Sequence, residues 1–135
     1  QSGWAAPQNW AAARDFAFTN PIHTGAHRTS ALTVAEGGAD IAAIDVLSWH
    51  LMQTHDPFTA GLRVLARTDP KPALPYITAL GRDADTMRAA VAHAIHALPS
   101  DTRATLGLKG VTYITATDYL ALPNPAPPPL PAPPN

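Results

Sequence analysis

The sequence of 135 residues contains no cysteine, which excludes disulfide bridges and thiolate chemistry and leaves the redox compartment open. Charged residues are also scarce, at 14% of the chain, and the formal net charge is −1. Because no basic stripe is present and the aromatic residues are not interleaved with Lys or Arg, we expect no nucleic-acid partner. No apolar run approaches the roughly 20 residues of a membrane-spanning helix, so we expect no direct membrane insertion.

The sequence also lacks the common catalytic and metal-binding motifs. No G-x-S-x-G nucleophile elbow, no Walker loop and no H-E-x-x-H pair occurs. Among the six histidines, His93 and His96 lie three apart on one predicted helix, but no carboxylate is spaced to complete a metal site with them. Only Ser2 and Ser30 are candidate nucleophiles. We therefore predict no metal, no other cofactor and no enzymatic activity.

Signals that start and stop helices recur along the chain. Asp45 and Asp83 stand where N-cap residues are expected, and Gly37 and Gly107 stand where a helix ends in a left-handed residue. Apolar residues recur at helical spacing between these signals, most clearly in the segment that follows Asp83. The sequence predicts helices over residues 4–14, 27–36, 45–55, 83–98, 101–106 and 117–122.

Short apolar or alternating runs predict β-strands between these helices. The run 40–44 is almost wholly apolar, as is typical of a buried strand in a parallel sheet. Prolines 70, 72 and 75 stiffen the chain and suit a crossover segment. The remaining predicted strands are 16–22, 62–67, 76–80 and 111–114. Together the elements predict an α/β fold, with a parallel or mixed sheet flanked by helices.

Two polar side chains lie where α/β proteins bind ligands. Asp45 directly follows the predicted strand 40–44 and begins a helix, and His27 begins a helix close to Gly25. Ligands of open α/β sheets lie outside the carboxyl ends of strands, where helix N-termini point their free N–H groups. A bland interpretation stays open, in which Asp45 is only an N-cap, His27 only a surface residue at a helix start and Ser2 only the cap of the first helix.

Four motifs occur in order along the chain, at Gln1–Gly3, Gly25–Ala31, Ala39–Asp45 and Leu62–Pro75. Together they resemble the phosphate, phosphite and phosphonate substrate-binding proteins of ABC transporters. The first looks like the end of the family's D-S-x-S-G turn, which binds the phosphoryl group, and Ala26 replaces a serine of the second. The resemblance spans roughly residues 1–122 and implies a type II periplasmic-binding-protein-like fold, here a partial two-lobe protein.

The resemblance also implies what the protein does and where. It implies a monomeric, periplasmic protein that captures a phosphorus oxyanion by closing two lobes around it and delivers it to ABC permease subunits. It places Ser2, Gly3, Trp4 and His27 at the ligand. Asp45 would lie beside them, either accepting a hydrogen bond from a protonated ligand oxygen or orienting the His27 imidazole.

One departure from the family's pattern reduces the range of ligands that we expect. Leu47 and Leu74 look like the positions at which acidic residues hold the ammonium group in family members that bind aminoalkyl phosphonates. The resemblance therefore favours phosphite, phosphate or a simple alkylphosphonate. Alternatives are a binding protein for another small ligand, a truncated fragment or interaction module without its own transport function, and, third, an enzyme that uses His27.

The expected domain organisation follows from the same resemblance. Residues 1–69 are predicted to form the second, ligand-binding lobe, and residues 70–122 the crossover and the return into the first lobe. Residues 123–135 form a tail in which eight of thirteen residues are proline, a composition that adopts polyproline II or stays disordered. The first residues contain no initiator Met and no signal peptide, so we expect that a leader was removed or that the chain begins within a longer protein.

Overall fold

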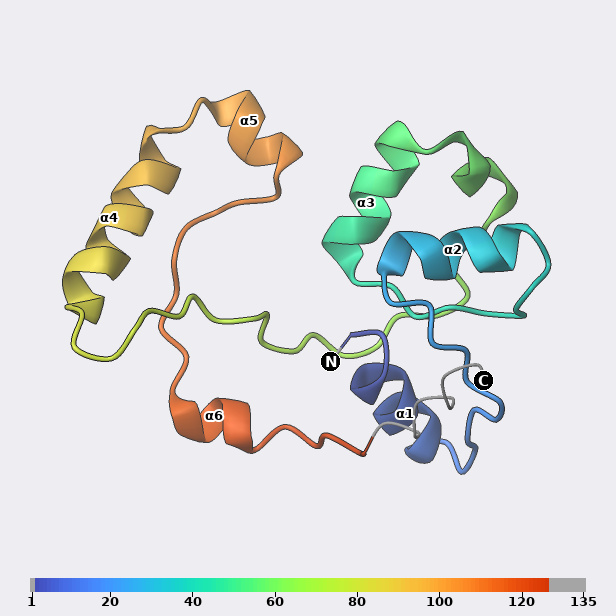
Figure 1. Cartoon of the computed structure of the whole chain (residues 1–135). Helices are drawn as coiled ribbons and strands as arrows, with labels where there is room; N and C mark the ends of the chain where they lie inside the picture. The colour runs from blue at the N-terminus through green and yellow to red at the C-terminus, as the bar shows by residue number, and fades with distance from the viewer. Residues whose placement is uncertain (1, 127–135) are drawn as a thin grey trace, which may run out of the picture. The chain divides into compact units, whose positions relative to one another are not determined.

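The computed structural model describes residues 2–126 (Figure 1). Gln1, which belongs to the predicted phosphoryl-binding turn, and residues 127–135 of the predicted proline-rich tail lie outside the described residues. The chain divides into two compact units. Unit 1 contains the chain up to Pro70 and again from Leu122, and unit 2 is Lys71–Ala121.

Unit 1 is built from helices. Its α2 contacts both α3 and the 3-10 helix η1. The guanidinium of Arg28 in α2 donates twice to Oδ1 of Asp56, at 2.9 and 2.7 Å, which ties α2 to the residue that precedes η1. Ala31 of α2 and Met52 of α3 are buried. The elements are α1 (Ala5–Ala12), α2 (His27–Ala35), α3 (Val46–His55) and η1 (Pro57–Gly61).

The ends of α2 and α3 confirm the predicted capping residues. The carboxylate of Asp45 accepts a hydrogen bond of 2.9 Å from the Ser48 amide, as an N-cap does. At the end of α2, Gly37 adopts a φ of 76°, a left-handed conformation that costs glycine no Cβ clash. The amides of Gly37 and Gly38 then donate to the carbonyls of Val34 and Thr33, at 3.1 and 2.8 Å, and satisfy the last turn.

Unit 2 is also helical. The Asp83 carboxylate accepts from the amides of Asp85 and Thr86, at 3.1 and 3.2 Å, and so caps α4 as predicted. The hydroxyl of Tyr119 donates to the carbonyl of Ala73 at 2.8 Å, a contact across 46 positions of sequence. The helices of this unit are α4 (Ala84–Ala97), α5 (Ser100–Thr105) and α6 (Ala116–Leu120).

The predicted α/β sheet is wrong for this structure, because residues 2–126 contain no β-strand. All five predicted strands are loops that make no backbone ladder within the described chain. Several of their apolar side chains face solvent: Ile41 is 44% exposed, Leu65 65% and Ile77 91%. An apolar run favours an extended backbone, but a strand also needs a second backbone about 4.8 Å away to receive its hydrogen bonds. The predicted arrangement of a sheet flanked by helices is therefore replaced by helices joined by long loops.

Within residues 2–126, buried apolar side chains are few, and most are small. Edge-to-face contacts add an aromatic cluster between α1 and the loop after it, in which the rings of Phe16 and Phe18 lie 4.7 Å apart and those of Trp10 and Phe16 lie 6.4 Å apart. Helix capping and a few long-range hydrogen bonds therefore contribute much of what determines the fold. The buried apolar residues are Ala5, Ala11, Ala31, Met52 and Ile95.

Candidate functional site

Three of the predicted site residues meet in unit 1. The Nε2 atom of His27 lies 3.0 Å from Oγ of Ser2 and 3.1 Å from Oδ2 of Asp45. Ser2 precedes α1, His27 is the first residue of α2, and Asp45 is the N-cap of α3. The two contacts therefore join the segment that precedes α1 to the N-terminal ends of α2 and α3, which lie close together in Figure 1.

The N-terminal end of α2 has no side-chain cap. The residue before it, Ala26, makes no side-chain capping hydrogen bond. The amides of the first helical turn have no partner inside the helix, and the helix dipole places about half a positive charge at this end. The preceding loop is held by the hydroxyls of Thr24 and Ser30, which lie 2.6 Å apart, and it turns at Gly25, whose φ is 78°. An oxyanion suits such a helix end.

The Asp45 carboxylate lies beside the imidazole and is ionised at neutral pH. Partial burial raises the pKa of Asp45, but hydrogen bonding from Ser48 and the nearby His27 lower it more, so its pKa falls below the ordinary value of 3.8. An ionised carboxylate only accepts hydrogen bonds, and the tautomer of His27 sets the direction of the contact between Nε2 and Ser2. With a proton on Nε2 the Ser2 oxygen accepts, and without one the Ser2 hydroxyl donates to the ring.

This arrangement differs from that of a hydrolytic triad. In a Ser–His–Asp triad, serine and aspartate bind different ring nitrogens, so that the histidine can take the serine proton while the aspartate holds the opposite N–H. Here Ser2 and Asp45 both approach Nε2. The arrangement therefore lacks the separate aspartate contact to Nδ1 with which a triad orients its histidine.

The other two predicted residues have different surroundings. A Cβ built on Gly3 would lie 3.5 Å from Cε1 of His27 and 3.8 Å from the carbonyl of Ala43, so Gly3 lies against the imidazole. The indole N–H of Trp4 instead donates to the carbonyls of Pro125 and Ala126, at 3.1 and 3.2 Å. The structure thus brings Gly3 to the His27 site, whereas the polar group of Trp4 binds the C-terminal segment.

Sequence reasoning missed part of this environment. The hydroxyl of Ser30 contacts that of Thr24, six positions earlier, and no sequence rule gives a signal for this contact. The N–H of Ser48 on the Asp45 carboxylate could have been found, since an N-cap side chain binds the amide two or three positions on. In residues 2–126 no group of three or more metal-binding side chains occurs, and no helix is long and apolar enough to cross a membrane.

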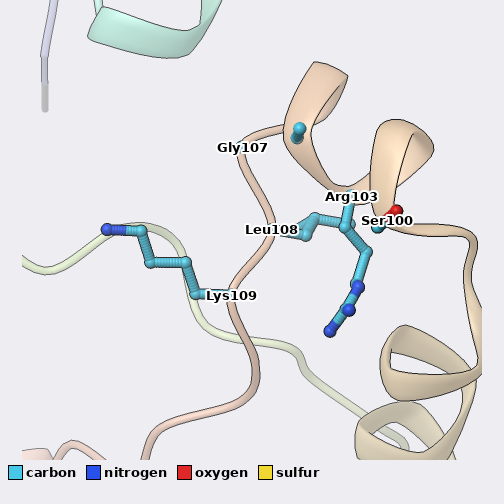
Figure 2. A pocket seen from close by; sticks show the side chains of 6 residues that line it. Ser100, Arg103, Gly107, Leu108 and Lys109 are labelled. Carbon is cyan, nitrogen blue, oxygen red and sulfur yellow. The ribbon is translucent and has the colours of Figure 1, made fainter.

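A separate cavity lies in unit 2. It measures about 430 Å³ and is lined by residues of α5 and the loop after it, including Ser100, Arg103, Leu108 and Lys109. Figure 2 shows the Lys109 and Arg103 side chains extending in different directions, so the two cationic groups do not converge on one point. The Arg103 Nε–H is buried without a hydrogen-bond partner in the described chain. The cavity therefore offers no focused anion site comparable to the one at His27.

Comparison with known proteins identifies the family. A family model described as "ABC transporter, phosphonate, periplasmic substrate-binding protein" matches residues 1–119. No curated protein and no solved structure matches the chain. The family is one of periplasmic transport proteins and not of enzymes, and a substrate-binding protein of an ABC transporter has a small ligand and a permease as partners. Since the match covers most of the chain and agrees with the resemblance seen in the sequence, the chain belongs to the periplasmic phosphonate-binding proteins of ABC transporters.

Proposed function

We propose that the chain captures a phosphorus oxyanion at the N-terminal ends of α1, α2 and α3, for delivery to an ABC permease. The observation that carries this proposal is the convergence of Ser2, His27 and Asp45, with 3.0 and 3.1 Å contacts to one imidazole nitrogen. This convergence lies inside the range that matches the phosphonate-binding family.

The donors around this point suit a phosphoryl group. The Ser2 hydroxyl, the Gly3 amide and the open amides at the start of α2 are all donors, and phosphoryl oxygens are strong acceptors. His27 is held between Ser2 and Asp45, so its ring is oriented before a ligand arrives. The imidazole of His27 is about one quarter exposed and can be reached from solvent. Trp4 is retained as a ligand contact only on the strength of the family resemblance.

The Asp45 carboxylate favours one protonation state of the ligand. A fully ionised oxyanion would be repelled by Asp45, whereas a singly protonated oxyanion can donate its O–H to that carboxylate. The nearest arginine, Arg28, is paired with Asp56 and does not offset this repulsion. We therefore propose a monoanion of phosphite, phosphate or a simple alkylphosphonate as the ligand. Leu47 and Leu74 provide no carboxylate for the ammonium group of an aminoalkyl phosphonate.

We further propose that capture follows the mode implied by the family resemblance. Two lobes of a monomer close around the oxyanion in the periplasm, and the ligand stabilises the closed state through contacts made only there. The ligand can shift this equilibrium only by its difference in affinity for the two states. The donors at His27 would supply part of that difference.

Binding is tested by titrating the ¹⁵N-labelled chain with phosphite, phosphate, methylphosphonate and 2-aminoethylphosphonate, with sulfate as the fully ionised control. We expect amide shifts centred on Ser2–Gly3 and the start of α2, and weaker binding of aminoethylphosphonate and sulfate than of phosphite. His27→Gln should weaken phosphite binding about tenfold or more, as loss of a hydrogen bond to a charged group does. His50→Gln, on an exposed position of α3, is the matched control. Equal binding by both variants, or tightest binding of aminoethylphosphonate, would contradict the proposal.

A further inference from the structure

The region around α1 holds a second set of contacts that the oxyanion site does not use. The indole N–H of Trp4 donates to the carbonyls of Pro125 and Ala126, at 3.1 and 3.2 Å. The side-chain amide of Asn9 donates to the carbonyl of Pro123 at 2.9 Å. Both donors lie on or next to α1, and all three acceptors belong to one short proline-rich segment.

The spacing of donors and acceptors fits an extended proline-rich chain. Polyproline II has three residues per turn and rises about 3.1 Å per residue, so the carbonyls of Pro123 and Ala126 would face the same side, about 9 Å apart. Five residues of α-helix, the separation of Trp4 and Asn9, rise about 7.5 Å. The spacing of these carbonyls and the rise between the two donors are similar enough for both donors to reach carbonyls of one segment. Because Trp4 meets Ala126 and Asn9 meets Pro123, the segment runs antiparallel to α1.

The chemistry of the contact is selective for such a segment. Proline has no N–H and resists helix and sheet, so the carbonyls of a proline-rich chain stay available to outside donors. Indole N–H groups beside an apolar ring are a common device for binding polyproline II segments. Residues 122–126 contain no ionisable side chain, so the contact uses no charge from the segment.

We propose that Trp4 and Asn9 form a binding surface for a proline-rich segment, and that its occupant is residues 123–126 of the same chain. The occupant lies beyond residue 119, where the family match ends. Because the segment belongs to the same chain, its binding is intramolecular, which favours it over a free competitor. The inference is independent of the proposed oxyanion function.

The test uses the full chain with ¹⁵N-labelled tryptophan. The three indole N–H signals are assigned by single Trp→Phe variants, and Trp49 on α3 serves as the internal reference. Replacing both Pro123 and Pro125 by Gly keeps their carbonyls but loosens the segment. We expect the Trp4 indole signal to shift and its exchange with solvent to rise about fivefold, as loss of a typical hydrogen bond predicts. The Trp49 signal should not move.

A second variant removes a donor without touching the segment. Asn9→Asp keeps the side-chain size but replaces the donating amide by an acceptor, and Gln53→Glu on an exposed position of α3 makes the same change of charge elsewhere. We expect Asn9→Asp, and not Gln53→Glu, to shift the Trp4 signal. In the parent chain that signal should be unchanged in 1 M NaCl, since the partners are neutral. A Trp4 signal that ignores both Asn9→Asp and the double Gly variant overturns the proposal. Dependence of the parent signal on protein concentration also overturns it, because the occupant would then be a second copy.

Discussion

The two roles of Asp45 can be separated by comparing two substitutions. Its Oδ1 caps α3 through Ser48, and its Oδ2 contacts His27. Asn caps a helix nearly as well as Asp but carries no charge, so Asp45→Asn removes the ionic part of the His27 contact and keeps the cap. Asp45→Ala removes both.

The structure sets the size of each effect. The His27 and Asp45 side chains are 27% and 35% exposed, so their contact is largely screened by solvent and should contribute about 0.2–1 kcal/mol. Loss of the N-cap costs about 1 kcal/mol more. The free energy of unfolding should therefore fall slightly in Asp45→Asn and by roughly 1–2 kcal/mol in Asp45→Ala.

The assay is urea unfolding followed by tryptophan fluorescence. All three tryptophans lie in unit 1, so the signal reports the unit that contains Asp45. A double-mutant cycle with His27→Gln isolates the pair, and 1 M salt should reduce its coupling energy. Asp45→Ala as stable as the parent chain would refute the capping argument, and no coupling at low salt would refute the ionic one.

Three further predictions test other parts of the chain. The pKa of Asp45 is lower in the folded chain than its ordinary value of 3.8. The stability that its ionised carboxylate contributes is therefore complete above pH 3.8 and is lost as the pH falls through the lowered pKa. Thermal melts should show a steeper loss of stability below about pH 4 for the parent than for Asp45→Asn. Gly37→Ala should cost about 1 kcal/mol in urea unfolding, because alanine is strained at a φ of 76°, whereas Gly61→Ala, which meets open space and has no such φ, should cost less. Ile95→Ala, at a position 6% exposed, should cost about 2 kcal/mol and reduce the far-UV helix signal of unit 2; a change within 0.5 kcal/mol would show that Ile95 packs against little.

The sequence predicted the features that depend on a few neighbouring residues. Asp45, Asp83, Gly37 and Gly107 set the limits of helices through hydrogen bonds that span six residues at most, so they could be found without knowing the fold. The prediction of a sheet was wrong because a sheet depends on residues that are far apart in the sequence. The run 40–44 determines its own extended tendency but not whether another backbone lies beside it, and in residues 2–126 none does.

The candidate site was predictable in part. The family resemblance placed Ser2 and His27 together, and their side chains lie 3.0 Å apart although 25 positions separate them. No local rule could have shown that Asp45 would share the same imidazole nitrogen, because that depends on how α2 and α3 pack. The contact between Trp4 and Pro125 spans 121 positions and involves a main-chain acceptor, which leaves no side-chain pattern to recognise.

The bonds between α1 and residues 123–126 also bear on the order in which the protein is made and folded. Asn9 and Pro123 are 114 positions apart, and at about 5–20 residues per second the ribosome needs roughly 6–23 seconds to cover that distance. A helix forms in about a microsecond or less, so α1 can exist long before its acceptors have been synthesised. During that interval Trp4 and Asn9 are open to water and to other polypeptides, including neighbouring nascent chains. Attachment of the segment to α1 is therefore among the last events in the maturation of unit 1.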